Sequence, residues 1–337
     1  MQKTRGLPIR IWRNKWFRRF LMTGTALLVL LPIIGAVYQW TATRNFERRN
    51  PPRGELIDVG GHRLHLHRQG QGKGSPVVVI DAGLAGGSYE WDALAAEIST
   101  VTEVCTYDRA GYGWSDRGPS PRSSQQIVAE LHTLLEKARV KPPYILVGHS
   151  FGGQNVRLYA SQYSNDVAGL VLVDSANYDL APDTAPIGQV PKLFHFLDGT
   201  AVLGTPRLWA PGLMKEPVNN PAARAHVLQL LTRTNSAHTV YDEMTGQTNW
   251  QTTRSALKHL GNKPLVVISR RIEEADFAGE EGQQNRHWLE EQKALVNISN
   301  KSKRIVTESK SHFLQYHEPK LIVDSVREMV ESVRASF

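Results

Sequence analysis

Cysteine is almost absent from this sequence, which holds a single one, Cys105. One thiol excludes an intrachain disulfide framework. Cys105 lies in the apolar run 101–107, where a thiol behaves as a small buried hydrophobic side chain rather than as a nucleophile. Clustered metal ligands are lacking too. Strand alternation puts His65 and His67 on one face and His62 on the other, with no cysteine or acid completing a ligand set, so we expect neither a metal nor a cofactor.

Acidic residues are scarce in the first 53 positions, which contain eleven lysines and arginines but only one acid, Glu47. This segment carries a charge of +10. The net charge of the whole chain is +8, so the remaining residues together carry −2. A nearly neutral domain lacks the basic groove that nucleic-acid binding requires, and we expect no nucleic-acid partner.

Charged side chains are missing from residues 21–40, and twenty helical residues are long enough to cross a bilayer. Seven basic residues precede this run and four follow it. The positive-inside rule therefore predicts a single-pass membrane protein with a basic cytoplasmic segment, 1–20, and the rest of the chain on the outer side. A cleaved signal peptide is the alternative, although the run is longer than a usual signal core. Residues 41–54, which contain Pro51, Pro52 and Gly54, read as a linker.

Short apolar runs alternate with helical patterns through the rest of the chain, 55–337, which predicts a mostly parallel sheet flanked by helices. A hairpin turning at Gly60–Gly61 is expected over 55–69. The expected strands are 77–81, 101–107, 144–147, 168–173, 265–268 and 304–307, and the expected helices are 88–98, 123–138, 153–163, 284–295 and 319–333.

Residues of about 175–260 break this alternation, with helical patterns only near 222–232 and 238–258. An insertion of this length between two sheet strands is usually functional. We interpret it as a lid, and this name is kept below.

Residues 148–152 read Gly-His-Ser-Phe-Gly, a match to G-x-S-x-G directly after an apolar strand and directly before a helix. The sharp strand-to-helix turn strains its central residue, and the flanking glycines allow close backbone packing. The turn exposes the Ser150 hydroxyl at the carboxyl end of the strand, with helix N-terminal amides pointing at it. Ser150 is therefore the candidate nucleophile.

At this motif, residues 55–335 resemble the α/β-hydrolase family of serine hydrolases. The resemblance implies that the backbone amides of Leu84 and Phe151 form an oxyanion hole. The usual His-Gly of the first loop reads Ala82–Gly83 here, but an amide donor does not depend on the side chain. The loop 107–115 resembles one that is structural in relatives.

The catalytic base of such an enzyme is a histidine after the last strand. His312 fits that position, and His317 competes with it from the entrance of the terminal helix. The acid that orients the base is harder to choose, and we favour Asp174 because it ends a strand and is rigidly held. The alternatives lie after the next strand: Glu273, Glu274 and Asp276.

These residues favour a serine hydrolase that cleaves a carboxylic ester, of esterase or lipase type, through an acyl-serine intermediate. A lid and a membrane anchor suit a lipophilic acyl substrate, with membrane lipid as the neighbouring partner. An aminopeptidase and a cofactor-free perhydrolase use the same residues, although aminopeptidase relatives usually carry tryptophan where Phe151 follows the serine. A non-catalytic ligand-binding protein on a hydrolase scaffold is the alternative of another class. The oligomeric state stays open.

Overall fold

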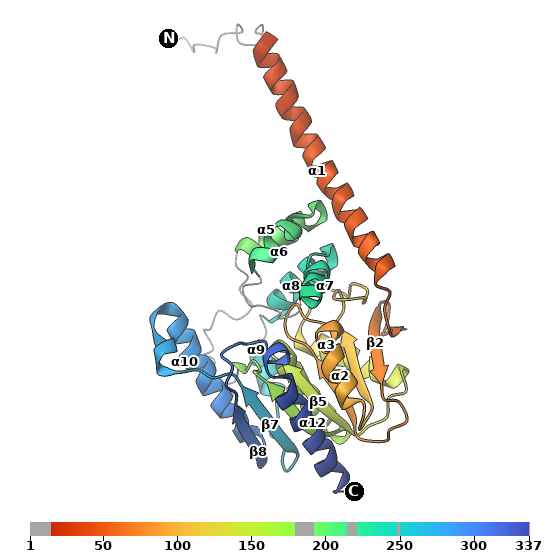
Figure 1. Cartoon of the computed structure of the whole chain (residues 1–337), viewed down its shortest axis with the longest axis vertical. Coiled ribbons are helices and arrows are strands. Elements are labelled where there is room, and N and C mark those ends of the chain that lie inside the picture. Colours follow the sequence, from red (N-terminus) through yellow and green to blue (C-terminus); the bar gives the residue numbers. More distant parts are fainter. Residues whose placement is uncertain (1–14, 179–191, 214–220, 248–249, 337) are drawn as a thin grey trace, which may run out of the picture.

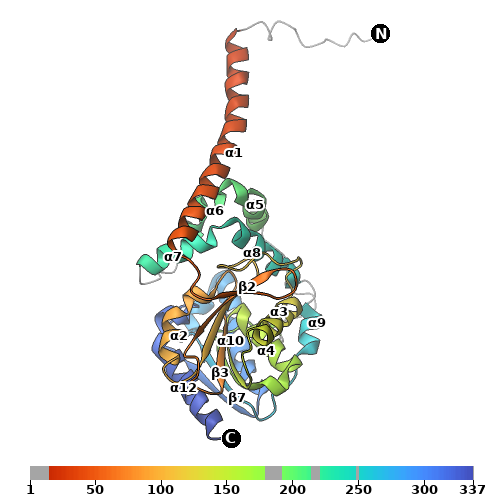
Figure 2. The ribbon, with the colours of Figure 1, turned by 90° about the vertical axis from the view of Figure 1, so that its right-hand side faces the viewer.

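The structure is a computed structural model that describes residues 15–178, 192–213, 221–247 and 250–336. The first fourteen positions of the predicted basic segment lie outside the described residues. A long N-terminal helix, α1 (Lys15–Arg49), projects from an α/β domain that contains the described residues after it (Figures 1 and 2).

One eight-stranded sheet forms the centre of the domain, in the order β1-β2-β4-β3-β5-β6-β7-β8. Strands β3 to β8 run parallel, while β1 and β2 form the predicted antiparallel hairpin at one edge. The strands are β1 (Glu55–Asp58), β2 (Arg63–Gln69), β3 (Val77–Asp81), β4 (Val104–Asp108), β5 (Tyr144–His149), β6 (Val167–Val173), β7 (Pro264–Ser269) and β8 (Lys301–Val306). The predicted mostly parallel sheet is confirmed.

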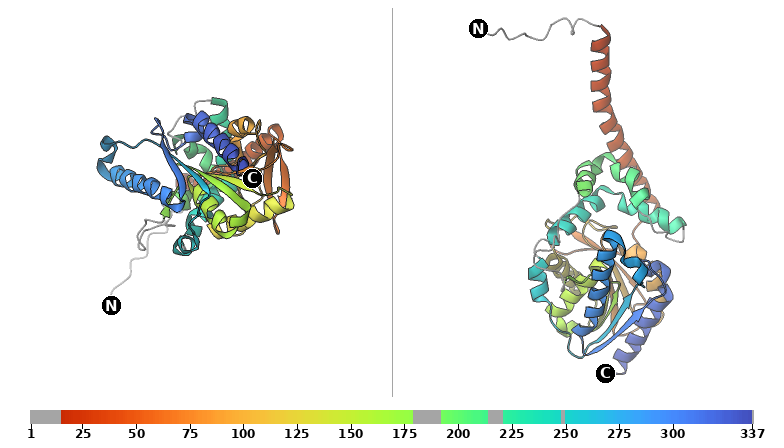
Figure 3. Two further views of the ribbon diagram at one scale, coloured as in Figure 1. Left: turned by 90° about the horizontal axis from the view of Figure 1, so that it is seen from below. Right: turned by 90° about the vertical axis from the view of Figure 1, so that its left-hand side faces the viewer.

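Helices cover both faces of the sheet because its central strands are apolar on both sides (Figure 3). Successive residues of β3 point to opposite faces, so Val79 packs on α3 (Ser124–Lys137) and α4 (Phe151–Gln162). Val78 packs on α2 (Asp92–Ile98) and α12 (Pro319–Arg334). Helix α10 (Gly279–Ala294) lies between β7 and β8 in the sequence, and the short α11 (Leu314–His317) directly precedes α12.

Helix α1 is longer than the predicted membrane segment, and this corrects the predicted linker 41–54. Residues 41–49 continue the helix, which leaves only 50–54 as a connection to the sheet. Contacts with the lid stabilise the extra turns. Phe46 is buried, and Glu47 forms an ion pair with Arg233 of the lid.

The lid lies between β6 and β7 in the sequence and sits beside the lower part of α1 (Figure 1). Its described part is more helical than the sequence pattern indicates, and the predicted segment 238–258 is split into two helices. The lid helices are α5 (Lys192–Thr200), α6 (Thr205–Leu213), α7 (Pro221–Leu231), α8 (Thr234–Gly246) and α9 (Trp250–Ala256), with the 3₁₀ turn η5 (Ala201–Leu203) joining α5 to α6.

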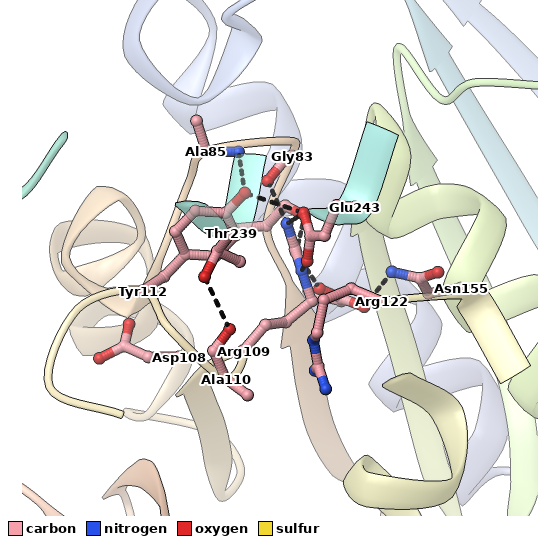
Figure 4. A network of polar contacts seen from close by, with 12 residues as sticks. Gly83, Ala85, Asp108, Arg109, Ala110, Tyr112, Arg122, Asn155, Thr239 and Glu243 are labelled. Atoms are coloured by element: carbon pink, nitrogen blue, oxygen red, sulfur yellow. Dashed lines mark hydrogen bonds and ion pairs between the residues drawn. The ribbon is translucent and has the colours of Figure 1, made fainter. Parts of the chain in front are cut away.

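A buried arginine, Arg109, joins the lid to the sheet (Figure 4). Its Nη1 lies 2.7 Å from Asp81 Oδ1 at the end of β3, and its Nε lies 2.7 Å from Glu243 Oε1 of α8. The same guanidinium donates to the carbonyls of Ala82 and Gly83, at 2.6 and 2.7 Å. The loop 107–115 therefore has the structural role expected of it, because it positions both the loop after β3 and the lid.

We predict that Arg109→Met lowers the free energy of unfolding by about 3–5 kcal/mol, because Asp81 and Glu243 become buried carboxylates without their cation. Chemical denaturation of the full chain in detergent, followed by circular dichroism, measures this change. Lys303→Met is the matched control, since Lys303 loses only its half-exposed partner Glu328. Equal losses in the two variants would contradict the assigned role of Arg109.

Candidate active site

Ser150 occupies the strained turn between β5 and α4, with φ 49° and ψ −120°. A non-glycine residue rarely adopts a positive φ, and such strain persists only where surrounding contacts hold it. The Ser150 amide donates to the Val173 carbonyl at 3.2 Å. Its own carbonyl accepts from the Gly153 and Ala176 amides, at 3.0 and 2.9 Å. The backbone around the serine is therefore held on both sides.

Three glycines make room for this turn. A Cβ atom on Gly152 would lie 2.2 Å from the Asp81 carbonyl oxygen, and one on Gly148 would lie 2.6 Å from the Gly153 Cα. A Cβ on Gly153 would lie 1.9 Å from the Ser175 hydroxyl. The predicted close backbone approach is found at the two glycines of the motif, and a third glycine leaves room for the Ser175 side chain.

Asp174 and His312 are brought together at the carboxyl edge of the sheet. The His312 Nδ1 lies 2.6 Å from Asp174 Oδ2, and the Asp174 side chain is fully buried. Its second oxygen accepts from the Arg270 amide at 3.2 Å and from the Trp288 indole at 3.1 Å. Burial opposes ionisation, but the hydrogen bonds from His312 and Trp288 and the charge of Arg270 together lower the pKa of Asp174. The carboxylate is accordingly ionised at neutral pH.

The three alternative acids point elsewhere. Glu273 lies 2.7 Å and Asp276 lies 3.1 Å from Lys310 Nζ, and Asp276 also accepts from the Glu273 amide. Glu274 is exposed on the same turn. Among the described residues, Asp174 alone of the four carboxylates contacts His312. His317, the competing histidine, ends α11 instead.

His149 was not singled out by the sequence, yet it supports the His312 backbone. Its Nε2 lies 2.9 Å from the His312 carbonyl oxygen, and the two rings are 4.8 Å apart. A carbonyl only accepts, so His149 Nε2 carries a proton and donates it. Burial, together with the charge of His312, lowers the pKa of His149 to about 3 and keeps the ring neutral. The only sequence signal was its place inside the motif, directly before Ser150.

A cavity of about 250 Å³ opens beside Ser150, beneath the lid helix α8. It is lined by Leu84, Ser150, Phe151, Ala176, Tyr178, Glu243, Met244, Gln247 and Trp288. The loop after β3 is adjacent to the serine, since a Cβ on Gly83 would lie 3.3 Å from the Ser150 Cβ. The structure thus brings together Ser150 and the two residues predicted to supply oxyanion amides.

His62, His65 and His67 each pair with a different carboxylate, and His62 lies in the turn just before β2 rather than in the strand where the sequence pattern placed it. His62 lies 3.2 Å from Glu130, His65 lies 2.8 Å from Asp108, and His67 lies 3.4 Å from Asp92. Within the described ranges, no group of three or more His, Cys, Asp and Glu residues is placed to hold a metal ion. These histidines brace the edge of the sheet.

Known proteins resemble this chain both in sequence and in structure. The uncharacterized protein YqjL of Bacillus subtilis is 29% identical over 264 residues, which are 78% of this chain and 87% of YqjL. A (lyso)-N-acylphosphatidylethanolamine lipase of Bos taurus is 31% identical over 152 residues, which cover 42% of this chain and 44% of the lipase. A solved thermophilic esterase from Thermogutta terrifontis has a TM-score of 0.60 at 19% identity, covering 82% of this chain and 97% of the esterase.

Structural likeness at so low an identity shows the fold alone. The sequence model of one family, described as the alpha/beta hydrolase fold, matches residues 76–268. That range runs from the start of β3 to the end of β7 and includes the turn at Ser150 and the whole lid. Because the match spans more than half of the chain, the protein belongs to the alpha/beta hydrolase fold family.

Proposed function

We propose that this protein is a serine hydrolase that cleaves a carboxylic ester, with Ser150 as nucleophile, His312 as base and Asp174 as the orienting acid. The observation that carries the proposal is the 2.6 Å contact between His312 and the buried Asp174, at the sheet edge where Ser150 leaves β5. An ionised acid that accepts from the imidazole Nδ1 leaves Nε2 without a proton and ready to act as a base.

In the proposed reaction, His312 Nε2 takes the Ser150 hydroxyl proton as the serine oxygen attacks the ester carbonyl. The carbonyl oxygen becomes an oxyanion, which the Leu84 and Phe151 amides stabilise. Collapse of the intermediate breaks the ester C–O bond, and the imidazolium returns its proton to the departing alcohol. Water then attacks the acyl-serine by the same route, releasing the carboxylic acid and restoring the serine.

The cavity favours a substrate with an apolar acyl group. Leu84, Phe151, Met244 and Trp288 contribute apolar lining. Among the described lining residues the one carboxylate is Glu243, which is bound by Arg109. Small apolar cavities with few polar groups suit acyl chains better than charged peptides. The lipid substrate named for the bovine relative agrees with this class.

We predict that Ser150→Ala abolishes hydrolysis of short p-nitrophenyl esters and covalent labelling by a fluorophosphonate, because both require the serine oxygen. His312→Ala should also prevent labelling, while the matched His317→Ala variant should label normally. Undiminished labelling of Ser150→Ala would assign the nucleophile to another residue. Absence of labelling in the wild-type chain would favour a non-catalytic binding protein.

We predict that Asp174→Asn lowers the turnover number by roughly 10⁴-fold, since an amide favours the wrong histidine tautomer. The matched variants Glu273→Gln and Asp276→Asn lose only contacts to Lys310 and should retain most activity. Steady-state kinetics with a soluble ester compares the three variants. A larger loss in either matched variant would transfer the role of the acid to that residue.

We further propose that α1 anchors the protein in a membrane, with the catalytic domain on the outer side. The helix is long and apolar enough to span a bilayer, and its most apolar stretch is not buried by the rest of the protein. The guanidinium of Arg19 lies over the Trp16 ring, and that of Arg44 lies over the Trp40 ring. The excess of basic residues before the apolar run supports this orientation.

A spanning helix predicts that the full chain stays in the membrane fraction during a wash with about 1 M salt, where the screening length falls to about 3 Å. Purely electrostatic attachment would be lost in that wash. Detergent, by contrast, should release the protein. Immunoblotting of pellet and supernatant measures the outcome, and release by salt alone would rule out the anchor.

A further inference from the structure

Large apolar side chains are exposed on the lid where it flanks α1. Phe196 of α5, Val202 of η5, and Leu208 and Trp209 of α6 have between 48% and 77% of their surface exposed. Figures 1 and 2 show α5 and α6 beside the lower half of α1. Soluble surfaces rarely gather so many large apolar groups, and such a patch marks an interaction site.

The lid contacts α1 inside its apolar run, not beyond it. A Cβ atom on Gly35 would lie 2.5 Å from the Leu203 carbonyl oxygen, and one on Gly204 would lie 3.5 Å from the Gln39 side chain. Contact therefore begins five residues before Trp40, the end of the uncharged run.

The length of α1 decides where the membrane must end. If the bilayer stopped above the lid, only residues 20–34 would remain between Arg19 and the first lid contact. Those fifteen residues span about 22 Å at 1.5 Å per residue, whereas the hydrocarbon core is about 30 Å thick. Covering that thickness requires the helix down to about Trp40, which is the part that the lid flanks.

The polar contacts between α1 and the lid suit this depth. Gln39 is buried, its amide donates to the Thr232 carbonyl at 2.9 Å, and its oxygen accepts from Arg207 at 2.6 Å. Polar groups within a bilayer need internal partners, and the lid supplies them. The ion pair of Glu47 with Arg233 lies two turns further on, where charged groups reach water.

We propose that the α5–η5–α6 hairpin of the lid is inserted in the bilayer beside α1, with Phe196, Val202, Leu208 and Trp209 in contact with lipid. This inference rests on the membrane anchor proposed above. The occupant of the patch is the bilayer itself, because the patch continues the lipid-facing surface of α1.

The inserted hairpin is connected to the cover of the candidate active site. The imidazole of His238 in α8 forms a hydrogen bond with the Asp198 carboxylate of α5, and the same α8 lines the cavity beside Ser150 with Glu243 and Met244. An acyl chain leaving the leaflet would meet the lid before it meets water. The substrate class that fits this arrangement is an acyl lipid taken directly from the membrane.

Single cysteines provide the test, because the native Cys105 is buried and burial raises its thiol pKa to about 12, leaving it unreactive to maleimides. Val202→Cys and Leu208→Cys would each carry an environment-sensitive nitrobenzoxadiazole label in the full chain. The protein would be reconstituted in phosphatidylcholine vesicles, with nitroxide lipids or aqueous iodide as quencher. Val306→Cys, at 50% exposure against 48% for Val202, is the matched control, and Val29→Cys marks the middle of α1.

We expect nitroxide lipids to quench the labels at positions 202, 208 and 29 several-fold more than the label at position 306. Iodide should show the opposite order. Iodide quenching at 202 and 208, with position 29 still protected, would overturn the inserted lid and leave the anchor intact. Iodide quenching at position 29 would overturn the anchor as well. Protection of 202 and 208 from both quenchers would mean that protein, such as a second copy, covers the patch, and this also overturns the proposal.

Discussion

The parallel pairing of β5 with β6 is the constraint on which the candidate site depends. His149 pairs with Val173, so the next residue of each strand, Ser150 and Asp174, leaves the sheet at the same edge. Both adopt positive φ angles, 49° and 37°. Hydrogen bonds from their amides to the neighbouring strands, at 3.2 and 2.7 Å, hold these strained turns in place. A shift in this register would separate the serine from the carboxylate that contacts His312.

A second dependence runs through Arg109, which binds the loop after β3 and the lid with one guanidinium. Glu243 takes part in that ion pair and also lines the cavity beside Ser150. The ion pairs of Arg109 therefore couple the position of the lid to the position of the loop that contains Leu84. Tyr112 strengthens the coupling, since its hydroxyl donates to Glu243 at 3.0 Å and accepts from the Ala85 amide at 3.3 Å.

The lid joins two parts of the chain that have different surroundings. On one side α8 lines the cavity beside Ser150, the candidate nucleophile, and on the other η5 packs against Gly35 of α1. A lid held by a helix of this length has a defined height above the sheet. In the proposed orientation, the membrane surface and the candidate active site are therefore separated only by the lid.

Local patterns in the sequence determined the sheet, the hairpin at Gly60–Gly61 and the turn at Ser150. Each depends on neighbouring residues: an apolar run, glycines that permit the turn, and a helix start. Ser123 is likewise a local feature, since its hydroxyl accepts from the Gln126 amide at 3.3 Å and caps the first turn of α3. Ser150 could be predicted as the candidate nucleophile for the same reason.

Tertiary structure alone decided which acid contacts His312, because Asp174 lies 138 residues away along the chain. Asp174 and Glu273 both follow sheet strands, so the sequence pattern does not distinguish between them. The path of the loop before His312 decides which carboxylate the imidazole contacts. The contact of His149 with the His312 carbonyl spans 163 residues of sequence, and it could not be predicted from local patterns either. The helical state of residues 41–49 also depends on distant partners, since Arg233 binds Glu47 across 186 residues. Short-range patterns describe elements, whereas contacts between distant segments exist only once the strand order and the lid have brought them together.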